Sequence, residues 1–289
     1  MAATTELSGR WYTSRESAKN LIGIDSSISD KDAQIDKHII GASELIEQYT
    51  KRRFIPWTGT KTFDYQGTRQ LVFGDDLLSI SSISDDDGTI SSSNYFLYPL
   101  DATDDNHPYL YMELLYTSEW FAYDDTAQSV ISITGKWGYS ERLREATTLG
   151  AHITGTSDTS LTATDGSLVA IGQTIKIDDE QMFISNISSN TVTVERAMNG
   201  TTAVTHGNAT EIYVVEPDPR IKTATEALVA RALHRADTAW SDRAGDPGMG
   251  FTYYRNLPTE IKMLLDGVKR IVNRPVRSFA KPTHAWVRQ

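Results

Sequence analysis

The chain contains no cysteine, which excludes disulfide bonds, thiolate catalysis and metal sites with cysteine ligands. It also lacks any run that approaches the roughly 20 apolar residues required for a membrane helix. Residues 1–9 contain no basic residue and no apolar run, so we expect no signal peptide there. These absences predict a protein that is made in the cytoplasm and does not enter a membrane.

Motifs that mark common catalytic sites are missing as well. The sequence has no Gly-x-Ser-x-Gly nucleophile motif, no phosphate-binding loop and no dinucleotide fingerprint. None of its six histidines pairs with another at the His-x-x-x-His spacing of zinc sites. We therefore expect neither an enzyme nor a cofactor, although paired carboxylates for hydrolysis leave no sequence signature.

Two acidic runs could suggest metal binding. Asp85-Asp86-Asp87-Gly88 lacks the alternating ligands and the distal glutamate of a calcium loop, whereas its Asp-Gly pair favours a hairpin turn. Asp178-Asp179-Glu180 could ligate a metal, but a hairpin tip explains this run equally well and no partner cluster is evident. We predict turns at both places and no metal site.

The net charge of −10 is unevenly distributed. Six basic residues and no acidic residue lie in residues 269–289, so residues 1–268 carry a charge of −16. A body this acidic repels phosphate, which argues against a conventional nucleic-acid binder. The basic segment could bind nucleic acid or an acidic protein surface, and its interleaved prolines and aromatic residues favour a protein. We predict these contact residues in it: Arg274, Arg277, Phe279, Lys281, Trp286 and Arg288.

Amphipathic helices are predicted near both ends of the sequence. Thr13 and Glu16 fit a capping box that opens a short helix. A longer helix, capped by Asp30 or Asp32, extends to about residue 53, because apolar residues recur there in steps of four and three. That apolar stripe consists of Ile35, Ile39, Ala42, Ile46 and Tyr49.

Two later helices are predicted at 219–240 and 258–272. Each begins at a proline, which the first helical turn tolerates. Their apolar stripes are Ile221, Ala224, Leu228, Ala232 and Leu233 in the first, and Ile261, Leu264, Leu265, Val268 and Val272 in the second. A single amphipathic helix is marginal alone, so we predict that the early and late helices form one core.

The residues between these helices have the pattern of strands. Short runs broken by glycines occupy 61–139 and end in Gly-Lys-Trp-Gly-Tyr-Ser. The Thr-, Ser- and Val-rich segment 146–215 predicts strands at 173–177, 181–187, 191–194 and 211–215, with turns at 178–179 and 189–190. Tyrosines and tryptophans between 95 and 123 could form a carbohydrate platform, but packing or a subunit interface is the favoured interpretation.

The order of these parts resembles that of the head–tail adaptor (connector) proteins of long-tailed bacteriophages. The resemblance covers about 11–140 and 217–275, and includes the Gly-aromatic-Gly-Tyr turn and the Leu-Pro-x-Glu-Ile-x-x-Leu-Leu sequence of 257–265. Residues 177–182, 194–202 and 206–207 resemble a small β module found inserted in phage structural proteins.

The resemblance implies an α+β fold. Its helical core would come from the N- and C-terminal segments, with a central antiparallel β region, an inserted all-β module and an extended C-terminal arm. The expected boundaries are 1–145 for the helices and central β region, 146–216 for the module, 217–273 for the late helices and 274–289 for the arm. We expect an autonomous module whose two ends lie close together.

The function implied by the resemblance is structural. The chain would form a homo-oligomeric ring, a dodecamer by resemblance, between the portal protein and a tail-side stopper or tail-completion protein. DNA would pass through an acidic or neutral channel without specific binding. The ring would assemble in the host cytoplasm and lie in the virion, with its arm disordered until it threads onto the portal.

Two alternatives stay open at this point. One is a β-rich phage tail or adhesion protein that binds carbohydrate through its aromatic residues. The other, weaker alternative is a hydrolase with carboxylate chemistry.

Overall fold

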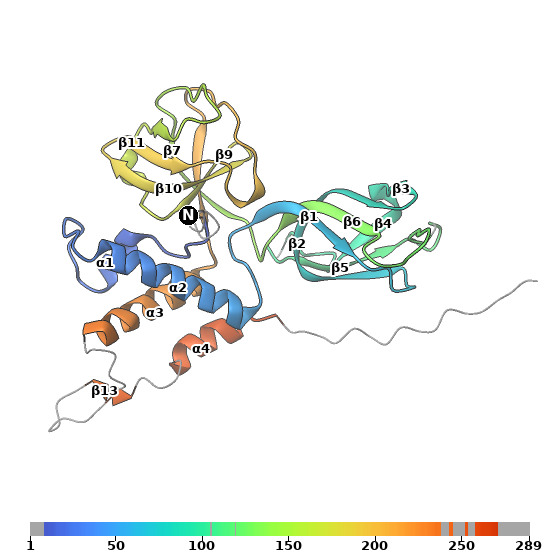
Figure 1. Ribbon diagram of the computed structural model, residues 1–289, viewed down its shortest axis with the longest axis horizontal. Coiled ribbons are helices and arrows are strands. Elements are labelled where there is room, and N and C mark those ends of the chain that lie inside the picture. The colour runs from blue at the N-terminus through green and yellow to red at the C-terminus, as the bar shows by residue number, and fades with distance from the viewer. Residues whose placement is uncertain are drawn as a thin grey trace, which may run out of the picture. The chain divides into compact units, whose positions relative to one another are not determined.

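The computed structural model describes residues 9–104, 106–118, 120–237, 243–244, 252–253 and 258–270 (Figure 1). The chain divides into two compact units. Unit 1 combines the residues up to Trp57 with Ser140–Arg270, and unit 2 contains Thr58–Tyr139. None of the helices in the described residues is long and apolar enough to cross a membrane.

The predicted α+β class with a helical core is wrong, because the protein is mostly β. It has two antiparallel six-stranded sheets, with 34% of residues in strands and 25% in helices. The periodicity of the long helices was a strong signal, whereas each short strand contributed little to the pattern. The individual strands are short, but they pair into two six-stranded sheets, and this pairing cannot be read from the sequence.

The described residues of unit 1 include four α-helices: α1 (Arg15–Leu21), α2 (Asp32–Thr50), α3 (Pro219–Asp237) and α4 (Thr259–Asp266). We call them the helical cluster, since α2 contacts the other three helices and α3 also contacts α1 and α4. The predicted contacts between early and late helices are therefore confirmed (Figure 1). Most stripe residues in the described part of the chain are buried, but Tyr49, Ala232 and Leu264 are only half-buried. The predicted stripe residue Val272 lies outside the described residues.

The starts of α1 and α2 differ from the predicted caps. Ser14, not Thr13, is the N-cap of α1, and its side chain accepts a hydrogen bond from the amide of Ser17. The Thr13 hydroxyl instead donates to Glu226 on α3. Neither predicted aspartate caps α2, because Lys31 occupies its N-cap position without a side-chain bond. Thr13 thus bonds to Glu226 on α3, although the local sequence predicts that it caps α1.

Unit 2 contains one sheet with the strand order β1-β6-β2-β5-β4 and β3 paired to β2. The strands are β1 (Trp57–Phe63), β2 (Gln70–Asp85), β3 (Gly88–Thr89), β4 (Tyr95–Tyr98), β5 (Tyr109–Leu114) and β6 (Ile131–Trp137). The Trp137 side chain is fully buried and donates through Nε1 to the carbonyl of Gly59 at 3.0 Å. The predicted hairpin turn is confirmed, since Asp85 pairs with Gly88 across it.

Unit 1 contains the second sheet, in the order β7-β12-β9-β10-β11-β8. Its strands are β7 (Arg142–Thr148), β8 (Ser160–Thr162), β9 (Thr174–Ile177), β10 (Glu180–Ser188), β11 (Thr191–Glu195) and β12 (Glu211–Glu216). The four predicted strands and both predicted turns are confirmed. β7 pairs with β12, so the ends of the module lie close together as expected, although the boundary predicted at 145/146 falls within β7.

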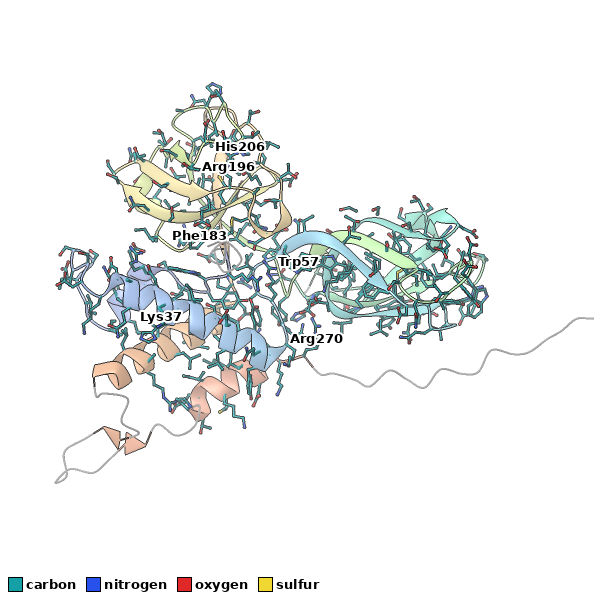
Figure 2. The ribbon with its side chains drawn as sticks, viewed as in Figure 1. Lys37, Trp57, Phe183, Arg196, His206 and Arg270 are labelled. Atoms are coloured by element: carbon teal, nitrogen blue, oxygen red, sulfur yellow. The ribbon has the colours of Figure 1, made fainter. Side chains whose placement is uncertain are left out.

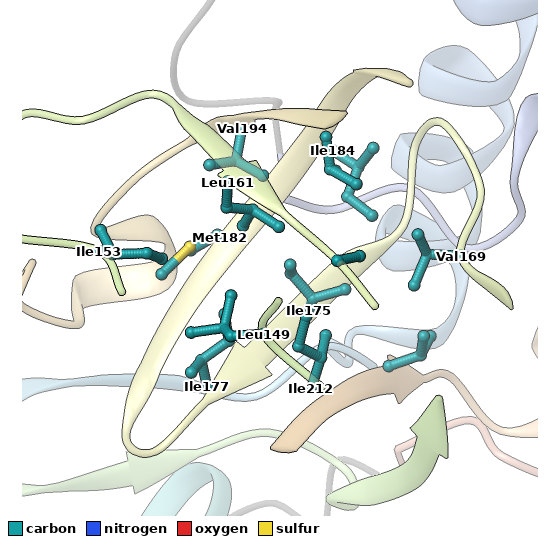
Figure 3. Packing of buried hydrophobic residues seen from close by; sticks show 13 residues of the cluster. Leu149, Ile153, Leu161, Val169, Ile175, Ile177, Met182, Ile184, Val194 and Ile212 are labelled. Carbon is teal, nitrogen blue, oxygen red and sulfur yellow. The ribbon is translucent and has the colours of Figure 1, made fainter. Parts of the chain in front are cut away.

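Buried aliphatic side chains from this sheet and its loops form one core (Figure 3). Thirteen buried residues form one cluster, which includes Ile175, Ile177, Met182, Ile184 and Ile212 from β9, β10 and β12. Because alternate residues of a strand point to opposite faces, the cluster needs only every second position, and the remaining positions are free for other contacts.

The β module packs against the N-terminal segment and the helical cluster. The ring of Trp11 lies 5.2 Å from that of Phe183, in an edge-to-face arrangement. The Gln181 side chain donates to the carbonyl of Pro56 at 3.1 Å, and the Asn199 side chain donates to the carbonyl of Gly9 at 3.3 Å. Unit 1 therefore contains both this module and the helices, whereas Thr58–Tyr139 belongs to the other unit. The autonomous folding expected of the module stays a prediction.

Candidate functional site

All six arm residues predicted to bind the portal lie outside the described residues: Arg274, Arg277, Phe279, Lys281, Trp286 and Arg288. The residues that lead to the arm are described. The amide of Arg270 donates to the carbonyl of Thr50 at 2.9 Å, and Lys269 lies over the Tyr49 ring with its Nζ 4.5 Å from the centroid. Lys269 and Arg270 thus lie beside the C-terminal end of α2.

A cluster of charged side chains lies inside the β module, where Arg196 and His206 are neighbours (Figure 2). We call Asp178, Glu180, Arg196 and His206 the Glu180 cluster. The Glu180 carboxylate is fully buried. It accepts two bonds from Arg196, through Nε at 2.6 Å and Nη2 at 2.7 Å. Such a two-pronged pair is among the stronger interactions in proteins, because both partners are charged and their planes match.

Further donors surround the same carboxylate. The amides of Ala197 and Val204 donate to it at 3.1 and 3.0 Å, and His206 Nε2 lies 3.0 Å away. Burial alone would raise the pKa of Glu180, but the bonds from Arg196, Val204, His206 and Ala197 outweigh it and lower the pKa from 4.5 to about 2. Glu180 is therefore ionised at neutral pH and joins β10 to the chain after β11.

His206 completes the cluster. Its side chain is fully buried, with Nδ1 2.7 Å from a carboxylate oxygen of the half-exposed Asp178. The histidine search missed it because its partners are acidic and lie 26 and 28 residues away in the sequence. The Asp178-His206 and Glu180-His206 contacts tie the β9–β10 turn to residue 206. This arrangement stabilises the module, and it presents no nucleophile to a substrate.

The acidic run at this turn does not assemble a metal site in the structure. Both oxygens of Glu180 already bind Arg196, and Asp179 points into solvent beside Lys176. Within the described ranges, no three His, Asp or Glu side chains are grouped to hold an ion. The run instead forms the predicted hairpin tip. Two of its residues, Asp178 and Glu180, also belong to the Glu180 cluster.

Unit 2 carries a pocket of about 140 Å³ beside Trp120. We call it the Trp120 pocket, and its lining includes Asp85, Asp87, Asn94, Leu114, Ser118 and Trp120. The side chain of Trp120 is 51% exposed. Among the tyrosines singled out from the sequence, Tyr116 and Tyr123 are exposed, whereas Tyr95, Tyr98, Tyr109 and Tyr111 are half-buried in β4 and β5.

The walls of this pocket are tied together by hydrogen bonds from separate parts of unit 2. Asp85 accepts from the amides of Ala122 and Asp87, at 2.9 and 3.2 Å. Asp86 accepts from the amide of Asp124 at 3.0 Å. The acidic turn thus reverses the chain and also holds the segment after Trp120, through the bonds to Ala122 and Asp124. A sequence-based search could not find this, since the bonded residues are 37 and 38 positions apart.

Comparisons with known proteins add no family. No protein-family model matches the chain, and no curated protein is significantly similar to it in sequence.

Proposed function

We propose that the protein is a head–tail adaptor of a tailed bacteriophage, which forms a ring between the portal and the tail side. The observation that carries this proposal is the association of α2 with α3 and α4, with two β regions inserted between them in the sequence. This arrangement agrees with the order of parts from which the resemblance was drawn. The β-rich composition comes from the central β region, which the resemblance includes, together with the inserted module.

The arm is the proposed contact with the portal. Arg270, the last described residue before the arm, is bonded to Thr50 at the end of α2. Phe279 and Trp286 would anchor it in pockets of the portal, where aromatic side chains contribute most of the binding energy. The basic residues Arg274, Arg277, Lys281 and Arg288 would meet acidic groups and accelerate docking.

The helical cluster is the proposed contact between neighbouring subunits. Leu45 on α2 and Met263 on α4 are 46% and 70% exposed. Since α2 and α4 are neighbouring helices, a second chain that covers them would bury both apolar side chains. A ring requires two different, complementary faces on each subunit, and the number of subunits, twelve by resemblance, is part of the proposal.

The charge distribution supports DNA passage without binding. Residues 1–268 carry −16, so a channel built from them would repel the duplex rather than retain it. Tight, salt-sensitive binding of duplex DNA by a protein that ends at Arg270 would contradict this part of the proposal.

The decisive experiment removes residues 274–289. We expect the shortened protein to fold and to form rings in electron micrographs, but not to dock on portal-bearing capsids. Replacing Phe279 and Trp286 by alanine should mainly accelerate dissociation from the portal. Replacing the three arginines and the one lysine of the arm by serine should mainly slow association. Undiminished docking by the shortened protein would move the portal contact to the helical cluster. If the full chain stays monomeric even with the portal protein, the adaptor proposal fails.

A carbohydrate-binding phage tail protein is the second candidate. The observation that favours it is the Trp120 pocket on a mostly β protein. Isolated protein would then bind glycans without forming a ring.

A further inference from the structure

The Trp120 pocket combines a fixed aromatic ring with polar side chains. The guanidinium of Arg69 lies over the indole ring of Trp120, 4.7 Å from its centroid. Arg69 is itself held by the carbonyls of Leu115 and Ser118, at 2.5 and 2.7 Å. Because the guanidinium covers one face of the ring and half of the side chain stays exposed, the remaining aromatic surface is available to a ligand in a fixed orientation.

Two polar side chains that line this pocket, Asp87 and Asn94, are available for hydrogen bonding. Asp85 is committed to the amides of Ala122 and Asp87, but the exposed Asp87 carboxylate has no hydrogen-bond partner within the described part of the chain. The backbone carbonyl of Asn94 accepts from the amide of Leu115, and its side-chain Oδ1 accepts from the Ser93 hydroxyl at 3.4 Å. The side-chain NH2 group of Asn94 therefore remains to donate. The pocket therefore offers a carboxylate acceptor and an amide donor beside an aromatic ring.

We propose that the Trp120 pocket binds one uncharged hexopyranose unit of a glycan. The C–H face of such a sugar is weakly positive and packs on the negative face of an aromatic ring. Its neighbouring hydroxyls both donate and accept, as the Asp87 and Asn94 side chains require. The two carboxylates of Asp85 and Asp87 outnumber the one guanidinium of Arg69 at Trp120, so the net negative charge disfavours an acidic sugar or a phosphate. Since the walls are tied in advance, little ordering would oppose binding.

This inference names the ligand class for the carbohydrate-binding candidate, on whose pocket it rests, and it does not depend on the adaptor proposal. A glycan site on unit 2 could serve a ring protein or a tail protein alike. Ring formation and sugar binding are measured separately, so failure of one leaves the other result intact.

The test is saturation-transfer NMR on the full chain with glucose, galactose, mannose and N-acetylglucosamine as separate probes. We expect transfer to the ring protons of at least one sugar. Trp120→Ala should weaken its binding by about tenfold or more, since one stacked ring contributes energy of that order. Asn94→Ala should also weaken binding, and it retains both Trp120 and the backbone bond to Leu115.

Phe96→Ala is the matched control. Phe96 is 52% exposed on the same sheet but does not line the pocket, so its loss should leave binding unchanged. Thermal melting of each variant reports whether unit 2 stays folded. The inference is overturned if no sugar receives saturation, if Trp120→Ala and Asn94→Ala both bind as the parent does, or if Phe96→Ala loses binding equally. Preferential binding of glucuronic acid over glucose would also overturn it, because it would contradict the charge argument.

Discussion

Removing the charge of Glu180 should destabilise unit 1 far more than removing a similar charge from the surface of the same sheet. In Glu180→Gln, Arg196 loses its anionic partner while its own side chain stays 6% exposed. Breaking a buried ion pair by removing one partner costs about 3–5 kcal/mol. Arg196 keeps bonds to the carbonyls of Asp158 and Val204, so we expect a loss near the lower end, about 3 kcal/mol.

The lowered pKa of Glu180, which reports the same contacts, leads to a similar magnitude. Its folded-state pKa of about 2 lies below the ordinary 4.5, so ionised Glu180 stabilises the folded state above pH 4.5. That stabilisation, about 3 kcal/mol, is lost as the pH falls from 4.5 towards 2. The parent protein should therefore lose stability in this range, and Glu180→Gln, which cannot titrate, should lose correspondingly less.

The control is Glu216→Gln on β12. Glu216 pairs with Arg144 at 2.8 Å, but both side chains are 42% exposed. An exposed pair of this kind contributes about 0.2–1 kcal/mol. Both variants make the same chemical change in the same sheet, so the difference between them isolates the effect of burial.

Scanning calorimetry is the suitable assay, because two compact units can unfold in separate transitions. We expect Glu180→Gln to lower the unit 1 transition by roughly 6–12 °C, with the unit 2 transition unchanged. The control should shift it by a few degrees at most. Equal small shifts for the two variants, or an acid-induced loss that Glu180→Gln shares in full, would refute the assignment of Glu180 as an ionised buried anchor.

Two further predictions concern packing within unit 1. Leu265→Ala should lower the free energy of unfolding by about 2–5 kcal/mol, because Leu265 is 1% exposed in the helical cluster. Met263→Ala, on the exposed side of α4, should lower it by under about 0.5 kcal/mol. Equal melting temperatures for the two variants would contradict the packing of α4 in the core. Gly172→Ala should destabilise the module, since its φ is +91° and a Cβ would lie 2.3 Å from the Trp11 ring. Chemical denaturation measures this loss, and a variant as stable as the parent would contradict the contact between Trp11 and the module.

The helical stripes were largely determined by the sequence. Ile35, Ile39, Ala42 and Ile46 are all buried on α2, as their spacing predicts. Spacing suffices here because the helix itself places residues three and four apart on one face. Tyr49 departs from the stripe: it is half-buried, and its hydroxyl donates to Asp266 on α4. That partner lies 217 residues away, so no local pattern could reveal it.

The individual strands of the β module could also be predicted, but their assembly could not. Alternation marks β9 to β12, and the turns at Asp178 and Ser189 are local features. The partner of each edge is decided by the whole sheet: β12 enters between β7 and β9, and the short β8 joins β11. The predicted fold class was wrong for this reason: the pattern of one strand is weak, and the sheet it joins is decided by strands elsewhere in the sequence.

The sequence by itself determined the helical faces, the hairpin turns and the concentration of positive charge after residue 268. Only the tertiary structure decided that Glu180, Arg196 and His206 meet, and that the β module packs on Trp11 while 58–139 forms a separate unit. The physical reason is the range of the interactions. Helix periodicity and turn geometry act over a few residues, whereas a buried ion pair or a shared core depends on chain segments that only the complete fold brings together.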